Sequence, residues 1–248
     1  MTLRRDDRFL SEPKPPILGS MSKTPLFDGD VVIAGGGLAG LTLALAMDQA
    51  GLSVAVVDAI EFSDQLAPEF DGRASALSYT SWRMFEALGV AEHLRDHVQR
   101  IEQILVCDGR PYGGTRPGGP GPHTLHFDRH EIAPDADGDP LGWMAENRHT
   151  RQALVRTLQD RPGIMPIAPA RAAGFERHTG GIDLVLDDGR RLSGRLLVAC
   201  DGRFSRLREL AGVRTAGWSY GQKGIVTTVE HEKPHEGVAY EYFMPGGP

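Results

Sequence analysis

Apolar and polar residues follow one another along the first part of the chain in the order expected for a strand, a helix and a second strand. Residues 30–34 form a short apolar run, which is typical of a buried parallel strand. Residues 38–50 carry leucines at helical spacing, and Gly51 is a typical helix stop. Residues 52–58 are again apolar. The pattern therefore predicts one βαβ unit and an α/β fold.

The rest of the pattern predicts further elements and one clear turn. Residues 182–192 alternate and turn at Asp188-Gly189, which indicates a β-hairpin. Residues 109–122 are rich in glycine and proline, so a turn between edge strands is expected there. Helices are expected at residues 75–88, 91–98 and 149–158, and strands at residues 101–106, 124–127, 196–199, 225–230 and 238–243.

Composition narrows the possible partners. The chain has 248 residues, with 27 Lys and Arg against 33 Asp and Glu, so its net charge is −6. Nucleic-acid phosphates call for a basic patch, and this mild acidity argues against a nucleic-acid partner. The two cysteines, Cys107 and Cys200, lack CxxC spacing. A disulfide framework or a structural zinc site is therefore not expected, and a reducing compartment is.

The N-terminal segment does not have the pattern of a targeting signal. Residues 1–29 mix arginines, acids and prolines and lack an apolar stretch, so we expect a disordered tail. No run of about 18 apolar residues occurs in the sequence, so no membrane-spanning helix is predicted. These features together favour a cytoplasmic protein.

The first motif is Gly35-x-Gly37-x-x-Gly40, placed between the first strand and its helix. Phosphate oxygens need backbone N–H groups at close range and the positive end of a helix. A carboxylate, Asp58, ends the next strand 18 residues after Gly40, near the spacing at which it accepts hydrogen bonds from ribose hydroxyls. A free 2′-hydroxyl suits this carboxylate and a 2′-phosphate does not. The motif predicts a site for FAD or NAD.

A second motif again follows a strand. Asp201-Gly202 ends the strand at residues 196–199, and Ser205 and Arg208 follow at helical spacing. A carboxylate and a glycine at this edge of a sheet suit a bound cofactor. The same residues also fit a plain strand-end turn with Ser205 at a helix start. The residues alone leave these two readings open.

Four segments together resemble the ubiquinone-biosynthesis hydroxylases, which are FAD monooxygenases with the p-hydroxybenzoate hydroxylase fold. The similarity runs in order over nearly the whole chain from residue 30. Residues 70–78 are the most discriminating, because many flavoproteins and dehydrogenases share the glycine motif. The segments are Gly-Gly-Gly-Leu-Ala-Gly at 35–40, Phe-Asp-Gly-Arg-Ala-Ser-Ala-Leu-Ser at 70–78, Glu-Asn-Arg at 146–148, and Cys-Asp-Gly at 200–202 with Ser205 and Arg208.

The resemblance implies a set of cofactor contacts and no catalytic or metal-binding residue. Arg73 is implied near the ribityl-pyrophosphate region of FAD and Arg148 against the cofactor, although both also fit surface ion pairs. Asp201 and Gly202 are implied beside the pyrophosphate. The ADP half of FAD is implied to contact Gly35, Gly37, Leu38, Ala39, Gly40 and Asp58.

The implied fold is a Rossmann-like FAD-binding domain at residues 30–100 and 148–212, interleaved with an incomplete β-sheet substrate domain at residues 101–147 and 213–248. The implied activity is hydroxylation of a polyprenylated phenol by O₂ through a flavin C4a-hydroperoxide, with NAD(P)H or another electron donor as reductant. Attachment to the inner face of the membrane or to a biosynthetic complex is also implied.

The chain departs from the family pattern in one large respect. Nothing in it matches the downstream Gly-Asp segment that closes over the flavin end of the cofactor, so the fragment alone is expected to be inactive. Two alternatives remain. One is a related FAD monooxygenase that hydroxylates a soluble aromatic compound. The other is a non-catalytic flavin-binding protein, if the chain naturally ends at Pro248.

Overall fold

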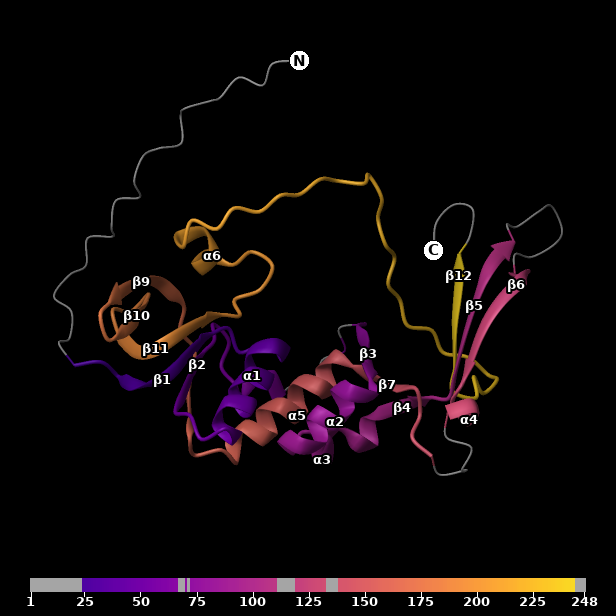
Figure 1. The fold of residues 1–248 in the computed structure, drawn as a ribbon, viewed down its shortest axis with the longest axis horizontal. Helices are drawn as coiled ribbons and strands as arrows, with labels where there is room; N and C mark the ends of the chain where they lie inside the picture. Colours follow the sequence, from indigo (N-terminus) through magenta and orange to yellow (C-terminus); the bar gives the residue numbers. More distant parts are fainter. Residues whose placement is uncertain (1–23, 67–69, 71, 111–118, 133–137, 244–248) are drawn as a thin grey trace, which may run out of the picture.

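A computed structural model of the chain describes residues 24–66, 70, 72–110, 119–132 and 138–243. Figure 1 shows a six-stranded sheet at one end, a three-stranded sheet at the opposite end, and helices with a second three-stranded sheet between them. The chain runs between the two ends several times, so each end is built from segments that are far apart in the sequence.

The six-stranded sheet has the order β8-β2-β1-β11-β10-β9. Strands β8, β2, β1 and β11 run parallel, and β11, β10 and β9 form an antiparallel meander. The carboxyl ends of β1, β2 and β11 therefore meet at one edge. The strands are β1 (Phe27–Ala34), β2 (Val54–Val57), β8 (Ile164–Ile167), β9 (Ala172–His178), β10 (Gly181–Leu186) and β11 (Arg191–Ala199).

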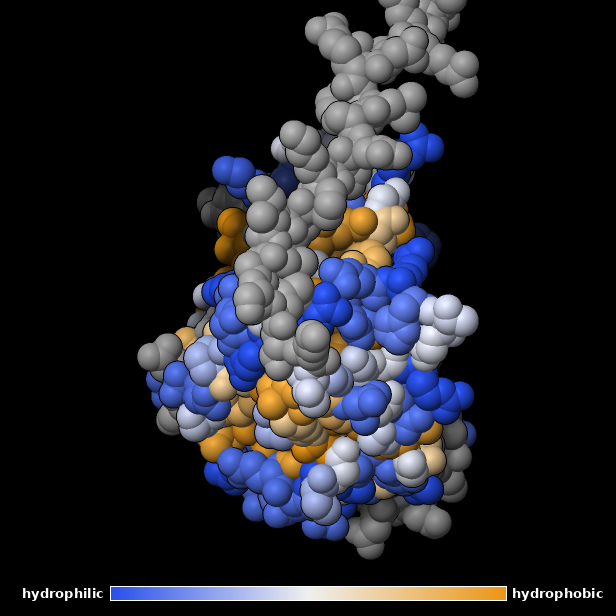
Figure 2. Space-filling view, turned by 90° about the vertical axis from the view of Figure 1, so that its left-hand side faces the viewer, coloured by the Kyte–Doolittle hydropathy of each residue, from blue (hydrophilic) through white to orange (hydrophobic). Residues whose placement is uncertain are grey.

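Both faces of this sheet are covered. Leucines 41, 45 and 154 are completely buried where α1 (Leu38–Gln49) and α5 (Asn147–Gln159) pack on one face. Leu184 and Leu192 are buried on the other face, with Leu207 of α6 (Arg206–Leu210). Each such leucine contributes about 1.5–3 kcal/mol through burial. The end of the molecule that carries this sheet shows a mainly hydrophilic surface with apolar residues between the polar ones (Figure 2).

The remaining elements form the other two sheets and short helices. One sheet has the order β3-β7-β4 and lies against α2 and α5; the other has the order β12-β5-β6. No helix in the described part of the chain is long and apolar enough to cross a membrane. The elements are β3 (Ala74–Ser78), β4 (Val98–Ile101), β5 (Gln103–Arg110), β6 (Gly119–Asp128), β7 (Gly142–Glu146), β12 (Val238–Phe243), α2 (Tyr79–Leu88), α3 (Ala91–Leu94), α4 (Arg129–Ile132), η1 (Asp64–Leu66) and η2 (Arg95–His97).

Several predicted elements are confirmed. The strand, helix and strand of the βαβ unit are β1, α1 and β2. The predicted hairpin is β10–β11, and Gly189 in its turn has a φ of +86°, which favours glycine. The strand at residues 238–243 is β12. The division of the chain into two domains stays a prediction.

The helix predicted at residues 75–88 is wrong in its first turn. Residues Ala74–Ser78 form β3, which pairs with β7 and alternates between exposed and half-buried positions. The helix α2 begins only at Tyr79, where the Ser78 hydroxyl accepts a hydrogen bond from the N–H of Ser81. An N-cap serine thus separates strand from helix.

Two further predictions need correction. Residues 225–230 form no strand, and Ile225 is 93% exposed, because no described strand lies beside them to pair with. The strand β1 begins at Phe27, inside the predicted tail of residues 1–29, because Phe27 to Gly29 continue the pairing with β11. Tail residues 24–26 are described and precede this strand, and residues 1–23 lie outside the described part.

Candidate functional site

The glycine-rich turn after β1 depends on close backbone packing. Gly35 has a φ of +110°, and its N–H donates a hydrogen bond to the carbonyl of Val57 at 2.7 Å. A Cβ on Gly35 would overlap the carbonyl of Cys200, and one on Gly40 would overlap the carbonyl of Gly35. These two glycines therefore hold β1, α1 and the end of β11 together, which is the packing role expected of them.

Gly37 differs from its neighbours in the turn. A Cβ placed on it would meet no protein atom within 4 Å, and its φ of −77° suits any residue. Gly37 is the N-cap of α1, and no side chain caps this helix. The positive end of a 12-residue helix thus borders open space. Nothing in the protein fills the space in front of Gly37, so this end of the helix is open to a ligand.

Asp58 ends β2 and faces the glycine-rich turn. Its Oδ2 accepts a hydrogen bond from the N–H of Gly36 at 2.6 Å. Its Oδ1 accepts one from the N–H of Ile60 at 2.8 Å and one from the side-chain amide of Gln65 at 3.4 Å. A carboxylate has about four acceptor positions, so capacity remains for a hydroxyl donor. Gly36 was not predicted, although it is the middle of three consecutive glycines; a Cβ there would crowd Phe62 and Asp58.

Asp201 lies directly after Cys200 at the end of β11. Its Oδ2 accepts a hydrogen bond from the N–H of Leu207 at 3.2 Å. Its Oδ1 is buried and has no hydrogen-bond partner within the described residues. A buried carboxylate oxygen without a donor is costly, so it favours a ligand that supplies one. Burial, with the nearby Asp201 carboxylate, raises the pKa of the Cys200 thiol, so this thiol is not activated as a nucleophile.

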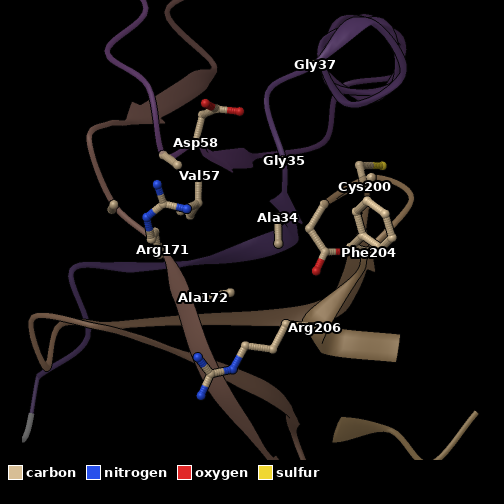
Figure 3. Close-up of a pocket in the computed structure, with 14 residues that line it drawn as sticks. Ala34, Gly35, Gly37, Val57, Asp58, Arg171, Ala172, Cys200, Phe204 and Arg206 are labelled. Atoms are coloured by element: carbon tan, nitrogen blue, oxygen red, sulfur yellow. The ribbon is translucent and has the colours of Figure 1, made fainter. Parts of the chain in front are cut away.

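These residues surround one cavity of about 440 Å³ at the carboxyl ends of β1, β2 and β11 (Figure 3). Ligands of α/β sheets bind at such an edge. Five predicted site residues line it: Gly35, Gly37, Asp58, Asp201 and Gly202. Three others, Leu38, Ala39 and Gly40, form the first turn of α1 behind it. The other lining residues are Ala34, Val57, Ala59, Ala170, Arg171, Ala172, Cys200, Phe204 and Arg206.

The two predicted arginines lie together elsewhere. Arg73 precedes β3, and its carbonyl accepts a hydrogen bond from the N–H of Asn147 at 2.9 Å. Arg148, on the first turn of α5, forms an ion pair with Glu146 at 2.7 Å and lies 5.2 Å from the ring centre of Phe70. Neither arginine lines the cavity. Their contact with a cofactor stays a prediction.

Sequence reasoning missed the outer wall of the cavity. Arg171, Phe204 and Arg206 lie there and are exposed. Phe204 and Arg206 stand within the second motif, beside Ser205, so proximity to that motif could have indicated them. Arg171 belongs to no motif, and only the fold brings it to the cavity.

The chain belongs to the family described as FAD binding domain, whose model matches residues 28–245. The ubiquinone hydroxylase UbiL of Rhodospirillum rubrum is 40% identical over 233 residues, which are 94% of this chain and 50% of UbiL. The 3-demethoxyubiquinol 3-hydroxylase of Escherichia coli is 28% identical, over 88% of this chain and 53% of that enzyme. The chain thus spans about half the length of the curated relatives it matches.

A solved structure shows the same fold. PqsL of Pseudomonas aeruginosa, a probable FAD-dependent monooxygenase, superposes with a TM-score of 0.58 at 21% identity, over 78% of this chain and 48% of PqsL. The resemblance to ubiquinone-biosynthesis hydroxylases and the α/β fold of flavin monooxygenases, both expected from the sequence, are confirmed.

The cavity fits the family's cofactor, FAD. The open space at Gly37 leaves room for phosphate against the amino end of α1. Asp58 retains acceptor capacity for a ribose hydroxyl, and the unpaired Oδ1 of Asp201 needs a donor. Phosphate has no hydrogen to donate, whereas a sugar or ribityl hydroxyl does. The chemistry of the site is therefore that of a nucleotide with hydroxyls on either side of its phosphates.

Proposed function

We propose that the protein is an FAD-dependent aromatic-ring hydroxylase of ubiquinone biosynthesis, and that this chain supplies the part that binds the ADP half of FAD. The observation that carries the proposal is the single cavity that gathers Gly35, Gly37, Asp58 and Asp201 from three strand ends. The 40% identity to a ubiquinone hydroxylase supports the pathway. Bound FAD supplies the oxygen-transfer chemistry, with NAD(P)H or another donor as the source of electrons.

The proposed roles of the residues follow from their chemistry. Gly37 leaves the N–H groups at the start of α1 accessible to the pyrophosphate, and Leu38, Ala39 and Gly40 carry those groups. Asp58 accepts a hydrogen bond from the adenosine ribose. Asp201 accepts one from a hydroxyl beyond the pyrophosphate, since a carboxylate facing phosphate would repel it. Gly202, with a φ of +86°, lets the chain turn closely past the ligand.

Two finer features belong to the same proposal. Arg73, directly before β3, and Arg148, at the start of α5, contact the cofactor beyond its ADP half. The aromatic substrate is a polyprenylated phenol, and the protein associates with the membrane surface or a biosynthetic complex to reach it. The names of the relatives, which are ubiquinone hydroxylases, support this choice of substrate.

A substitution at Gly37 tests the cofactor site. Gly37→Val places a side chain in space that the protein leaves open, so the fold should persist while phosphate approach is blocked. We expect the wild-type chain to bind FAD and the variant to lose at least about tenfold in affinity, as loss of 1.4 kcal/mol or more would give. Flavin fluorescence titration measures the affinity and circular dichroism the fold. A folded variant with wild-type FAD affinity would contradict the proposed phosphate position.

The substrate is tested in the organism. Deletion of the gene should lower ubiquinone and cause a polyprenylated phenol lacking one ring hydroxyl to accumulate. Mass spectrometry of the lipid extract identifies that compound, and complementation with the complete gene should remove it. Normal ubiquinone with accumulation of a soluble aromatic compound would instead favour a monooxygenase of soluble substrates.

A further inference from the structure

Two cationic side chains on the cavity wall, Arg171 and Arg206, have no role in the function proposed above. Arg171 lies between β8 and β9 and lines the cavity beside Asp58 and Val57 (Figure 3). No residue in the described part of the chain forms a hydrogen bond or an ion pair with its guanidinium group. Its guanidinium group is therefore available to a ligand bound in the cavity.

The backbone around Arg171 is fixed on both sides. The N–H of Ala170 donates a hydrogen bond to the carbonyl of Asp58 at 2.8 Å. The N–H of Arg171 donates to the Asp187 carboxylate at 3.2 Å, and the Arg171 carbonyl accepts from the N–H of Asp187 at 2.9 Å. The backbone of Arg171 is therefore fixed close to Asp58 through its neighbour Ala170. Because the N–H of Arg171 already donates to Asp187, its side chain is the part available to a ligand.

The position of the ribose fixes where the base must lie. A nucleoside carries its phosphate on C5′ and its base on C1′, at opposite ends of the sugar. With phosphate at Gly37 and the sugar at Asp58, the base leaves the sugar away from the glycine-rich turn. The cavity wall next to Asp58 consists of Ala59, Ala170, Arg171 and Ala172. Three methyl groups and one planar guanidinium suit the flat face of a purine.

We propose that Arg171 stacks its guanidinium group on the adenine of the bound nucleotide and is a determinant of affinity for the adenosine half of FAD. This inference rests on the proposed function, since it needs the ribose at Asp58. In this arrangement the planar guanidinium group acts on the face of the purine through a cation–aromatic contact. A lysine, which is a compact charge and not a plane, cannot replace it.

The test compares ligands with and without the base on this chain. Arg171→Ala should weaken ADP and FAD by about tenfold, the size of one cation–aromatic contact. It should leave the affinity for inorganic pyrophosphate unchanged. Arg171→Lys should behave like Arg171→Ala for ADP. Arg177→Ala is the matched control, because it removes the same charge from an exposed position of β9 outside the cavity, and we expect less than a twofold change. Isothermal titration measures each affinity.

The outcomes separate this inference from the proposed function. If the wild-type chain binds neither FAD nor ADP, the proposed function fails. If it binds both and Arg171→Ala binds them equally well, only the role of Arg171 fails. Equal weakening of pyrophosphate and ADP would show that Arg171 binds phosphate, and full rescue by Arg171→Lys would show that charge alone acts. Either result overturns the stacking proposal. Unfolding midpoints check that each variant keeps the fold.

Discussion

The sheets at the two ends of the molecule differ in how well they are covered. In the six-stranded sheet, Ile33 and Leu184 are completely buried by helices on one face and by α6 and neighbouring strands on the other. In the sheet β12-β5-β6, Leu125, Tyr240 and Phe243 remain 57%, 58% and 48% exposed. The cavity proposed to hold the ADP half of the cofactor lies in the first region. That region is thus covered by its own core, whereas the other keeps large apolar side chains exposed.

The pairing of the second sheet shows that both its faces are apolar. Ile104 pairs with Phe127, and Leu105 pairs with Tyr240, so successive residues of β5 place these pairs on opposite faces. A three-stranded sheet needs at least one face packed to be stable by itself. Open apolar faces of this kind mark surfaces that other protein groups cover. The two sheets therefore differ in how far the described residues cover them.

The largest effect on stability is expected at Gly40, in the covered region, where the protein leaves no space for a Cβ atom. Gly40→Ala would place a Cβ onto the carbonyl of Gly35, so the turn between β1 and α1 has to shift. We expect a loss of about 4 kcal/mol or more in the free energy of unfolding, together with loss of FAD binding. Urea unfolding measures the first. Gly37→Ala is the control, since its Cβ meets open space, and a Gly40→Ala variant as stable as this control would contradict the packing.

A matched pair of leucines tests the comparison itself. Leu184→Ala removes a completely buried side chain from β10, and Leu125→Ala removes an exposed one from β6. The first should cost about 3 kcal/mol through lost burial and the cavity left behind. The second should change stability by about 0.5 kcal/mol or less. Thermal unfolding of both variants gives the difference. Equal losses would show that the three-stranded sheet is covered in solution, and the comparison would fail.

The covered region is also the one that sequence predicted best. The strand, helix and hairpin of the six-stranded sheet carry their signals locally, in the apolar runs, Gly51 and Asp188-Gly189. The family motif then placed Gly35, Gly37, Asp58, Asp201 and Gly202, which line one cavity in the structure. Each of these residues stands at a strand end, where a turn and a ligand impose a short sequence pattern.

The features that the sequence did not predict depend on contacts between segments that are far apart in the chain. Residues 75–78 favour a helix locally, but β7, about seventy residues further on, pairs with them as a strand. Residues 225–230 have the composition of a strand, but a strand forms only beside a partner, and the described residues supply none. Arg171 reaches the cavity because Ala170 bonds to Asp58 and Arg171 to Asp187. No local sequence pattern indicates such contacts.

The smallest effect concerns two aspartates, one in each region. Burial raises the pKa of Asp183 in β10, but hydrogen bonds from Ser193 and Arg191 outweigh it, so the net pKa is lowered from its usual 3.8. The hydrogen bond from the N–H of His130, followed by that from its ring, lowers the pKa of Asp128 in β6. A carboxyl whose pKa is lower in the folded chain stabilises the fold above its usual pKa, and this contribution is lost as the pH falls through the folded value.

Asp183→Asn should therefore cost about 1–2 kcal/mol at pH 7, the size of hydrogen bonds to a charged group that is largely shielded from water. The cost should shrink as the pH falls below about 4, because the wild-type carboxyl is then protonated as well. Asp128→Asn should have a smaller effect, since its one partner is a half-exposed histidine and the asparagine oxygen can still accept the hydrogen bond from the N–H of His130. Urea unfolding at pH 7 and at pH 3 measures both variants. A cost for Asp183→Asn that does not depend on pH would show that packing, and not the ionised carboxylate, holds β10 to β11.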